Sequence, residues 1–341
     1  MENVDVGQLA KVTTKKANLT KRETLSERSK EYGRAATAEN SRLAYEADLK
    51  SFQTFCVEHG ELALPALPQT VADYFTYLAE TGKAVATIKR RAVSIGQSHA
   101  LAGYESPVKH PVVRKVLQGI KRTHGSAQHK KTALTGEALP TALLAIDTCS
   151  LMGKRDKAII LLAFALAGRR SEVAALNVED IEFRSTGLVV TLRKSKTDQE
   201  GQGREVGVPR LPHEGLCPVR AVEEWIAAAG GGTPLTHGPL FRVFALAGKG
   251  QEQQLSEKQI DGRAVAALVK RVTSKAGIKG DFSGHSLRSG FITTAASTKG
   301  VTEGDIQAVS GHRSVPQLRS YVQRANVLKD CPLSAMFGGA T

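Results

Sequence analysis

The sequence predicts a mainly α (α+β) fold, with an all-α N-terminal domain and a mostly helical C-terminal domain that holds a small antiparallel sheet. Its 341 residues are enough for two domains. Through most of the chain the apolar residues recur at steps of three and four, the period of an amphipathic helix. Only residues 178–208 contain short β-branched segments separated by turn residues.

The N-terminal domain is expected over residues 36–125, after a flexible and mildly basic arm at 1–35 that lacks an apolar stripe. Four helices follow from the apolar spacing, and the second has Thr70 as a plausible N-cap and Gly82 as its end. Their expected places are 39–60, 67–82, from near Thr87, and 111–123.

Small and polar residues mark an interdomain linker at 126–135, and the second domain is expected over 136–341. It opens with helices, passes through a short β region, and becomes helical again. The expected helices are 136–147, 154–168, 218–229, 259–276, 285–297, 305–310 and 314–325, and the expected strands are 178–183, 187–193 and 204–208.

The chain is strongly basic, with a formal net charge of +14 and an isoelectric point of about 9.7. Such an excess favours a polyanionic partner, either nucleic acid or an acidic membrane surface. The most apolar run, 158–168, is shorter than the ~20 residues that cross a bilayer. The N-terminus lacks the apolar core of a secretory signal. We therefore expect no membrane partner.

The positive charge is concentrated between residues 83 and 131, where eleven Lys and Arg oppose one acid, Glu105, for a net +10. Binding a polyanion relieves self-repulsion on this scale. DNA or RNA therefore explains the segment better than a merely solvated face does. The candidate DNA-binding residues are Lys89, Arg90, Arg91, Lys121, Arg122, Lys130 and Lys131.

The four cysteines are far apart and form no C-x-x-C pair, so nothing indicates a zinc or redox site. We expect reduced thiols, mostly buried, in a cytoplasmic protein. No carboxylate cluster of the two-metal kind is present either, and we expect no metal.

Two short motifs in the second domain each place complementary groups on one helical face. Arg169 and Glu172 are three residues apart, as are His285 and Arg288. A guanidinium that leaves an apolar helix needs a carboxylate or a phosphate as its partner. Taken alone, the first motif fits a local ion pair, and the second is too common to indicate a site.

A third motif follows, in which Gly311-His312 ends one helix and Tyr321 lies about two turns into the next. In this order and spacing, SGHSLRSGFITT…GDIQAVSGHRSVPQLRSYV resembles the second-half signature of the tyrosine recombinase (phage integrase) family. RRSE resembles the first arginine motif of that family, with Arg169 in register. SKT, between two expected strands, offers Lys196 as the catalytic lysine.

For two of the predicted catalytic residues, a nearby residue of similar chemistry is an alternative. Arg170 competes with Arg169, and Glu172 favours Arg169 because it lies three residues on. Lys194 competes with Lys196, and the Lys-Thr dipeptide of the family favours Lys196.

The resemblance implies a division of labour at a DNA phosphodiester. Tyr321 would attack the phosphorus and form a 3′-phosphotyrosine link, which conserves bond energy so that no ATP is needed. Lys196 would protonate the departing 5′ oxygen, and His285 would help take the tyrosine proton.

The same resemblance assigns the remaining groups to the phosphate. Arg169 and Arg288 would donate paired N–H groups to the non-bridging oxygens, a task that suits guanidinium geometry. His312 would hydrogen-bond the phosphate. The implied chemistry needs neither a metal nor another cofactor.

The resemblance covers roughly residues 38–330, with the first domain as a core DNA-binding domain. The helix order and TGKAVATIKRR of that domain look like the Cre-type branch. The implied partners are a double-stranded recombination site and three further copies, as a homo-tetramer on two sites. A tail at 331–341 would dock on a neighbour. A cytoplasmic, nucleoid-associated protein of prokaryotic, phage or mobile-element origin is expected.

Two alternatives use the same fold. A type IB topoisomerase would relax DNA by similar chemistry without exchanging partners, and a DNA-binding regulator would bind without catalysis. The basic helical domain and the tail favour recombination over relaxation, and the six chemically competent residues disfavour the regulator.

Overall fold

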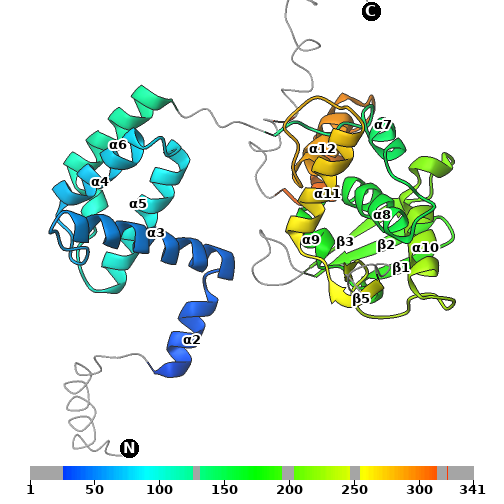
Figure 1. Cartoon of the computed structure of the whole chain (residues 1–341), viewed down its shortest axis with the longest axis horizontal. Coiled ribbons are helices and arrows are strands. Elements are labelled where there is room, and N and C mark those ends of the chain that lie inside the picture. The colour runs from blue at the N-terminus through cyan, green and yellow to red at the C-terminus, as the bar shows by residue number, and fades with distance from the viewer. Residues whose placement is uncertain (1–25, 126–130, 194–202, 246–253, 313–320, 322–341) are drawn as a thin grey trace, which may run out of the picture. The chain divides into compact units, whose positions relative to one another are not determined.

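The computed structural model describes residues 26–125, 131–193, 203–245, 254–312 and 321 (Figure 1). The chain divides into two compact units, Met1–Gln128 and His129–Thr341. The mainly α fold with a small antiparallel sheet is confirmed. The division falls inside the segment that we expected to be a linker, but the second half of that segment belongs to the second unit. There the backbone N–H of Leu134 donates to the carbonyl of Ser286 at 2.9 Å.

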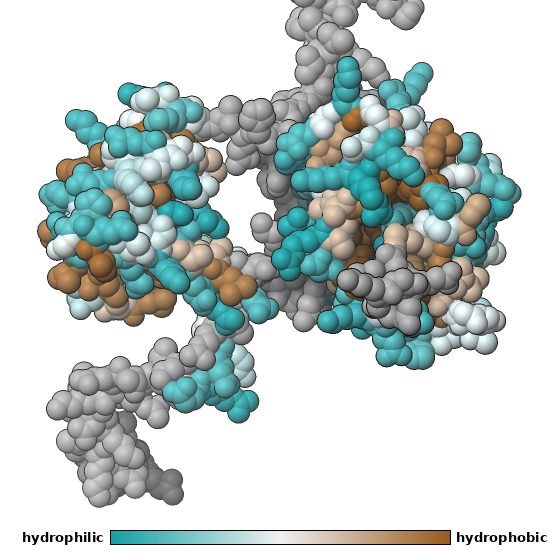
Figure 2. All heavy atoms as spheres, viewed as in Figure 1, coloured by the Kyte–Doolittle hydropathy of each residue, from teal (hydrophilic) through white to brown (hydrophobic). Residues whose placement is uncertain are grey.

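Five α-helices make up the described part of the first unit, with a 3-10 turn at Pro107–Lys109, and its described residues hold no strand. The aromatic side chains of Phe52, Tyr74 and Phe75 fill its centre and are almost fully buried. On the face that Figure 2 shows, hydrophobic and hydrophilic residues are intermingled. The helices are α2 (Glu27–Ala35), α3 (Glu39–Glu58), α4 (Pro68–Glu80), α5 (Val85–Leu101) and α6 (Pro111–His124).

Two expectations for this unit are wrong. Residues 27–35 form α2 instead of a flexible arm, because Glu, Arg and Lys favour helix without an apolar stripe and Ser26 caps the first turn. Thr70 is not an N-cap. The helix begins at Pro68, whose fixed φ suits the first helical position, and the Thr70 hydroxyl donates to Glu61 Oε2 at 3.2 Å.

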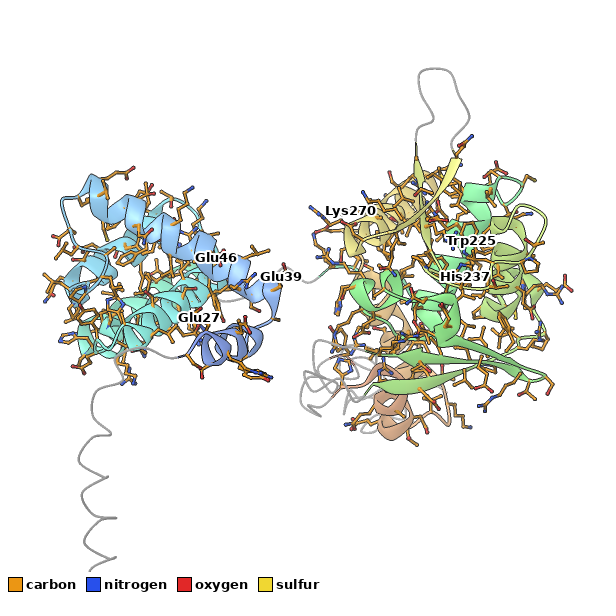
Figure 3. The ribbon with its side chains drawn as sticks, turned by 90° about the horizontal axis from the view of Figure 1, so that it is seen from below. Glu27, Glu39, Glu46, Trp225, His237 and Lys270 are labelled. Atoms are coloured by element: carbon orange, nitrogen blue, oxygen red, sulfur yellow. The ribbon has the colours of Figure 1, made fainter. Side chains whose placement is uncertain are left out.

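The second unit is built around α8 (Leu151–Ala165), whose buried run from Ala158 to Ala163 confirms the expected core helix. Helix α10 (Pro218–Ala229) packs against it. Trp225 of α10 (labelled in Figure 3) is fully buried. Its indole N–H donates to Leu240 O at 2.7 Å. The other helices are α7 (Leu139–Leu144), α9 (Arg170–Ala174), α11 (Gly262–Lys275), α12 (Ser286–Ser297) and α13 (Glu303–Ser310).

The expected sheet is an antiparallel meander of β1 (Ile181–Arg184), β2 (Gly187–Leu192) and β3 (Arg204–Pro209). The last paired residues of β2 and β3 are Leu192 and Arg204, and residues 194–202 lie between them in the sequence. Residues 178–180, expected as strand, form a 3-10 turn instead. The side chain of Asp180 accepts the backbone N–H of Asn177 there and caps the turn.

A second antiparallel pair, β4 (Arg242–Ala245) with β5 (Gln254–Gln259), was not expected. Its second strand reads QLSEKQ, which carries almost no β-branched or apolar signal. Among the described residues, no helix is long and apolar enough to cross a membrane. Cys56 and Cys217 are buried as expected and Cys149 is exposed, while Cys331 lies outside the described residues.

Candidate active site

Arg169, the first arginine of the predicted site, is fixed at the N-terminus of the helix that it caps. Helix α8 ends in a tight turn in which Ala167 has φ 44°, and Arg169 then becomes the N-cap of α9. The buried Glu172 carboxylate accepts from the Arg169 backbone N–H at 2.9 Å and from its Nη1 at 2.5 Å. This pair fixes the guanidinium of Arg169, which keeps 19% of its side chain exposed.

The neighbouring arginine has a different place. The aliphatic part of Arg170 packs on Gly262 and Gly284, where an added Cβ would stand 3.0–3.1 Å from it. Arg170 is exposed, while Arg169 lies within electrostatic reach of His285 and Arg288. The structure therefore groups Arg169, and not Arg170, with the other predicted site residues.

The second arginine is among the most deeply buried side chains of the molecule. Arg288, on α12, is 1% exposed, and its Nη1 donates to the Ala167 carbonyl at 2.6 Å. Its Nη2 lies 3.1 Å from His312 Nε2. Burial and the nearby charge of Arg169 lower the pKa of Arg288 to about 10, so the guanidinium still carries its charge at neutral pH.

His312 follows a left-handed cap. Gly311 ends α13 with φ 62°, a conformation that favours glycine, and turns the chain so that His312 is buried. Ser310 Oγ lies 2.7 Å from its Nδ1, and Gln307 Nε2 donates to its carbonyl. Burial and the charge of Arg288 lower the pKa of His312 to about 4, so the ring is neutral at pH 7.

The imidazole of His285 lies against the phenol. His285 Nε2 and Tyr321 Oη are 2.8 Å apart, within hydrogen-bond distance. His285 keeps an exposed surface, yet partial burial and the charges of Arg288 and Arg169 lower its pKa below the ordinary value. A neutral imidazole at this distance is able to accept the phenol proton.

These groups form one cationic site that includes a residue the sequence did not reveal. Arg204, at the start of β3, lies within electrostatic reach of Glu172, Arg169 and Arg288, and burial lowers its pKa. Arg169 and Arg204 are the cations, and Glu172 the carboxylate, whose charges shift the pKa of Arg288. With Arg288 itself, three guanidiniums therefore lie around one carboxylate. The site is therefore suited to an anionic ligand.

The predicted lysine cannot be placed with this cluster. Lys196 and its alternative Lys194 lie outside the described residues. In the sequence they lie between Leu192, the last residue of β2, and Arg204, the first residue of β3. Among the described residues, no group of three His, Cys, Asp or Glu side chains is placed to hold a metal ion.

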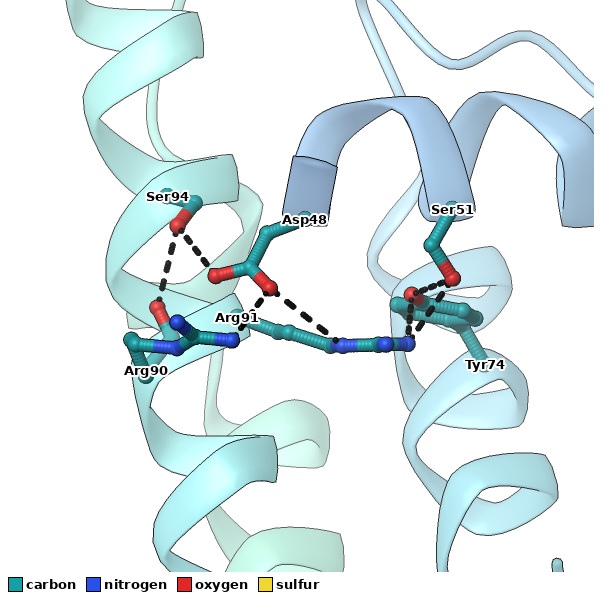
Figure 4. Close-up of polar contacts among 6 residues, drawn as sticks. All are labelled: Asp48, Ser51, Tyr74, Arg90, Arg91 and Ser94. Atoms are coloured by element: carbon teal, nitrogen blue, oxygen red, sulfur yellow. Dashed lines mark hydrogen bonds and ion pairs between the residues drawn. The ribbon is translucent and has the colours of Figure 1, made fainter. Parts of the chain in front are cut away.

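In the first unit, two of the predicted DNA-binding residues belong to a buried network (Figure 4). Asp48, 2% exposed, accepts from Arg90 Nη2 at 2.8 Å and lies 3.5 Å from Arg91 Nε. Arg91 Nη1 also donates to the hydroxyls of Tyr74 and Ser51. Its side chain is only 15% exposed, so it has little surface left for a partner.

The remaining predicted contact residues differ in exposure. Lys89 on α5, and Lys121 and Arg122 in the last turn of α6, are exposed. Lys131 belongs to the second unit and pairs there with Asp281, and Lys130 lies outside the described residues.

The sequence profile described as "Phage integrase family" matches residues 132–326. The chain is 34% identical to the "Integrase/recombinase xerD homolog" of Selenomonas ruminantium over 332 residues, 95% of this chain and 93% of that protein. It is 25% identical to "Recombinase cre" of Escherichia phage P1 over 286 residues, 80% of this chain and 81% of the relative.

Solved structures share the fold at low sequence identity. The Tn1549 transposon integrase bound to transposon right end DNA matches with a TM-score of 0.58 and 16% identity, over 87% of this chain and 96% of the other. XerH recombinase bound to palindromic difH substrate matches with a TM-score of 0.57 and 16% identity, over 79% and 72%.

Proposed function

The chain belongs to the tyrosine recombinase (phage integrase) family, and from that premise we propose that it is a site-specific recombinase acting through a covalent 3′-phosphotyrosine intermediate. The observation that carries the proposal is the 2.8 Å contact between His285 Nε2 and Tyr321 Oη, next to the buried cation Arg288. A phenol with a neutral base beside it and guanidiniums around it is the set that attack on a phosphodiester requires.

The first chemical step moves two protons and exchanges one P–O bond for another. Tyr321 Oη bonds to phosphorus while its proton passes to His285 Nε2, and the bond from phosphorus to the 5′ oxygen breaks. Lys196 gives a proton to that oxygen as it leaves. The 3′-phosphotyrosine keeps the phosphodiester's bond energy, so attack by a second 5′ hydroxyl rejoins DNA without a nucleotide.

Stabilisation of the transition state falls to the arginines. The pentacoordinate phosphate carries more negative charge than the ground state, and fixed guanidiniums bind that charge without reorganising. Glu172 fixes Arg169, and the Ala167 carbonyl fixes Arg288. His312, neutral at pH 7, lies beside Arg288 and would hydrogen-bond the phosphate.

DNA binding and assembly complete the proposal. Lys89, Lys121 and Arg122 are the exposed cations of the first unit that we assign to the DNA backbone. Two recombination sites would be held by a homo-tetramer in the cytoplasm, at the nucleoid. The tail at 331–341 would dock on a neighbouring copy, and deleting it should weaken pairing of sites more than binding to one site.

A nicked duplex that traps covalent protein tests the chemistry. Incubated with such a substrate, the wild-type chain should form an adduct that survives denaturation. Tyr321→Phe should bind the same duplex equally well and form none, because it keeps the ring and loses only the nucleophilic oxygen. An adduct from Tyr321→Phe would contradict the assignment of the nucleophile.

A plasmid with two copies of the bound site separates recombination from its alternatives. The proposal expects resolution or inversion products that depend on Tyr321. Relaxation of supercoils without such products would indicate a topoisomerase. Binding without any adduct on the nicked duplex would indicate a regulator.

A further inference from the structure

Arg204 joins two parts of the second unit that are distant in the sequence. It is the first residue of β3 and pairs with Leu192, the last residue of β2. Its Nη1 donates to the carbonyl of Val309, 105 residues later, in the last turn of α13. Gly311 and His312 follow directly after α13. The hydrogen bond therefore holds the end of the helix that leads into His312.

The fit around this guanidinium is close. A Cβ added at Gly311 would stand 2.9 Å from Arg204 Nε and 3.2 Å from its Cζ. Gly311 therefore meets two demands, since its φ of 62° favours glycine and its bare Cα leaves room for Arg204. The side chain is packed into the C-terminal cap of α13 and is not a surface cation.

The charge of Arg204 reaches the site as well. It acts on both Arg288 and His312, and burial lowers its own pKa. Among the described residues its Nη2 is buried without a hydrogen-bond partner. A desolvated cation with an unmatched donor costs stability, and a functional requirement accounts for such a cost.

We infer that Arg204 is a positioning residue of the active site, which links β3 to the end of α13 and so holds His312 against Arg288. The inference rests on the proposed function, because it assigns Arg204 to the reaction of Tyr321. It acts through His312, whose Nε2 lies 3.1 Å from Arg288 Nη2.

Single-turnover adduct formation on the nicked duplex, at saturating protein, tests this assignment. Arg204→Met keeps most of the side-chain volume and loses the hydrogen bond and the charge. It should slow adduct formation by about 10²-fold, the scale of a small misplacement of a catalytic group. Noncovalent binding to the same duplex, measured with Tyr321→Phe present in both proteins, should change far less. An undiminished rate in Arg204→Met would overturn the inference.

A double-mutant cycle separates positioning from simple damage to the fold. If Arg204 acts through His312, the loss caused by Arg204→Met should largely disappear in a His312→Gln background. Equal losses in both backgrounds would show that Arg204 does not act through His312. Should Arg204→Met fail to fold, the same cycle is run with Arg204→Gln, which also loses the charge and is too short to reach the Val309 carbonyl in the same way.

Arg210→Met is the matched control. Arg210 lies just beyond the other end of β3, ~20 Å along the strand, and pairs with Glu223 at the surface. Its replacement should leave the rate unchanged. A wild-type chain that forms no adduct would reject the proposed function itself, which keeps that failure distinct from a failure of this inference.

Discussion

Two arginine clusters, one in each unit, use the same residue type for different ends. In the first unit, the buried carboxylate of Asp48 lies between Arg90 and Arg91, and the hydroxyls of Tyr74 and Ser51 accept from Arg91 Nη1 (Figure 4). In the second unit, Arg169, Arg204 and Arg288 share the single carboxylate of Glu172.

The difference lies in what completes each cluster. Arg90 is half exposed, so water screens the charge that Asp48 does not balance, and Arg91 has Asp48, Tyr74 and Ser51 as partners within the protein. Arg288 is 1% exposed, and its hydrogen-bond partners are a backbone carbonyl and a neutral imidazole, so its charge is offset mainly by the carboxylate of Glu172, which Arg169 already binds. The first cluster holds helices together, and we propose that the second binds an anion.

The largest expected effect comes from removing charge from the second cluster. Arg288→Met should lower the single-turnover rate of adduct formation by about 10³-fold, the scale of losing one fixed donor to the transition state. Arg91→Met, the matched change in the first cluster, should leave the rate at saturating protein nearly unchanged. Similar losses in the two variants would remove the distinction between the clusters.

The second effect concerns stability. Asp48→Asn leaves Arg91 buried without its counter-ion, and breaking a buried pair in this way costs about 3 kcal/mol. Urea unfolding of the full chain, followed by a probe in the first unit, should show this loss in that unit's transition. A change below about 1 kcal/mol would mean that water already screens the network.

A third effect depends on pH and belongs to the second cluster. The pKa of His312 is about 4 when folded, against about 6.5 for an unperturbed histidine. The unfolded chain therefore binds the extra proton first as the pH falls. Stability present above pH 6.5 should be lost progressively toward pH 4, by up to ~3 kcal/mol. His312→Gln should remove this part of the pH dependence, and unchanged curves would contradict the depressed pKa.

The smallest effect tests which cations of the first unit meet DNA. Replacing exposed Lys121 and Arg122 by Gln should weaken noncovalent binding and lower the slope of log affinity against log salt by about 2, one for each phosphate contact. Arg91→Met should leave the slope as it is, since its guanidinium is already bound within the unit. A drop in slope for Arg91→Met would place it on the DNA after all.

Local sequence predicted most helices, because apolar spacing and end signals lie within the helix itself. Pro218 and the glycines after Ala229, for example, bound α10 where expected. Residues 254–259 were missed as a strand because their partner strand, and not their own composition, determines that structure.

The site residues likewise divide into those that the sequence predicted and those that it did not. The motif spacings brought His285, Arg288, His312 and Tyr321 together through a family resemblance, and the structure places their side chains in contact. Arg204 was missed because its partner is 105 residues away. A run of basic residues likewise does not reveal that Asp48, some forty residues earlier, already binds Arg90 and Arg91.

A substrate without charge at the reacting phosphate tests most directly whether the second cluster exists to bind an anion. With a methylphosphonate at the scissile position, the transition state carries one negative charge less. The ~10³-fold loss caused by Arg288→Met should then shrink to about 10-fold or less. The rate of Arg91→Met relative to wild type should be the same on both substrates. An equal loss for Arg288→Met on the charged and the neutral substrate would contradict the account, since the arginine would then serve the fold and not the phosphate.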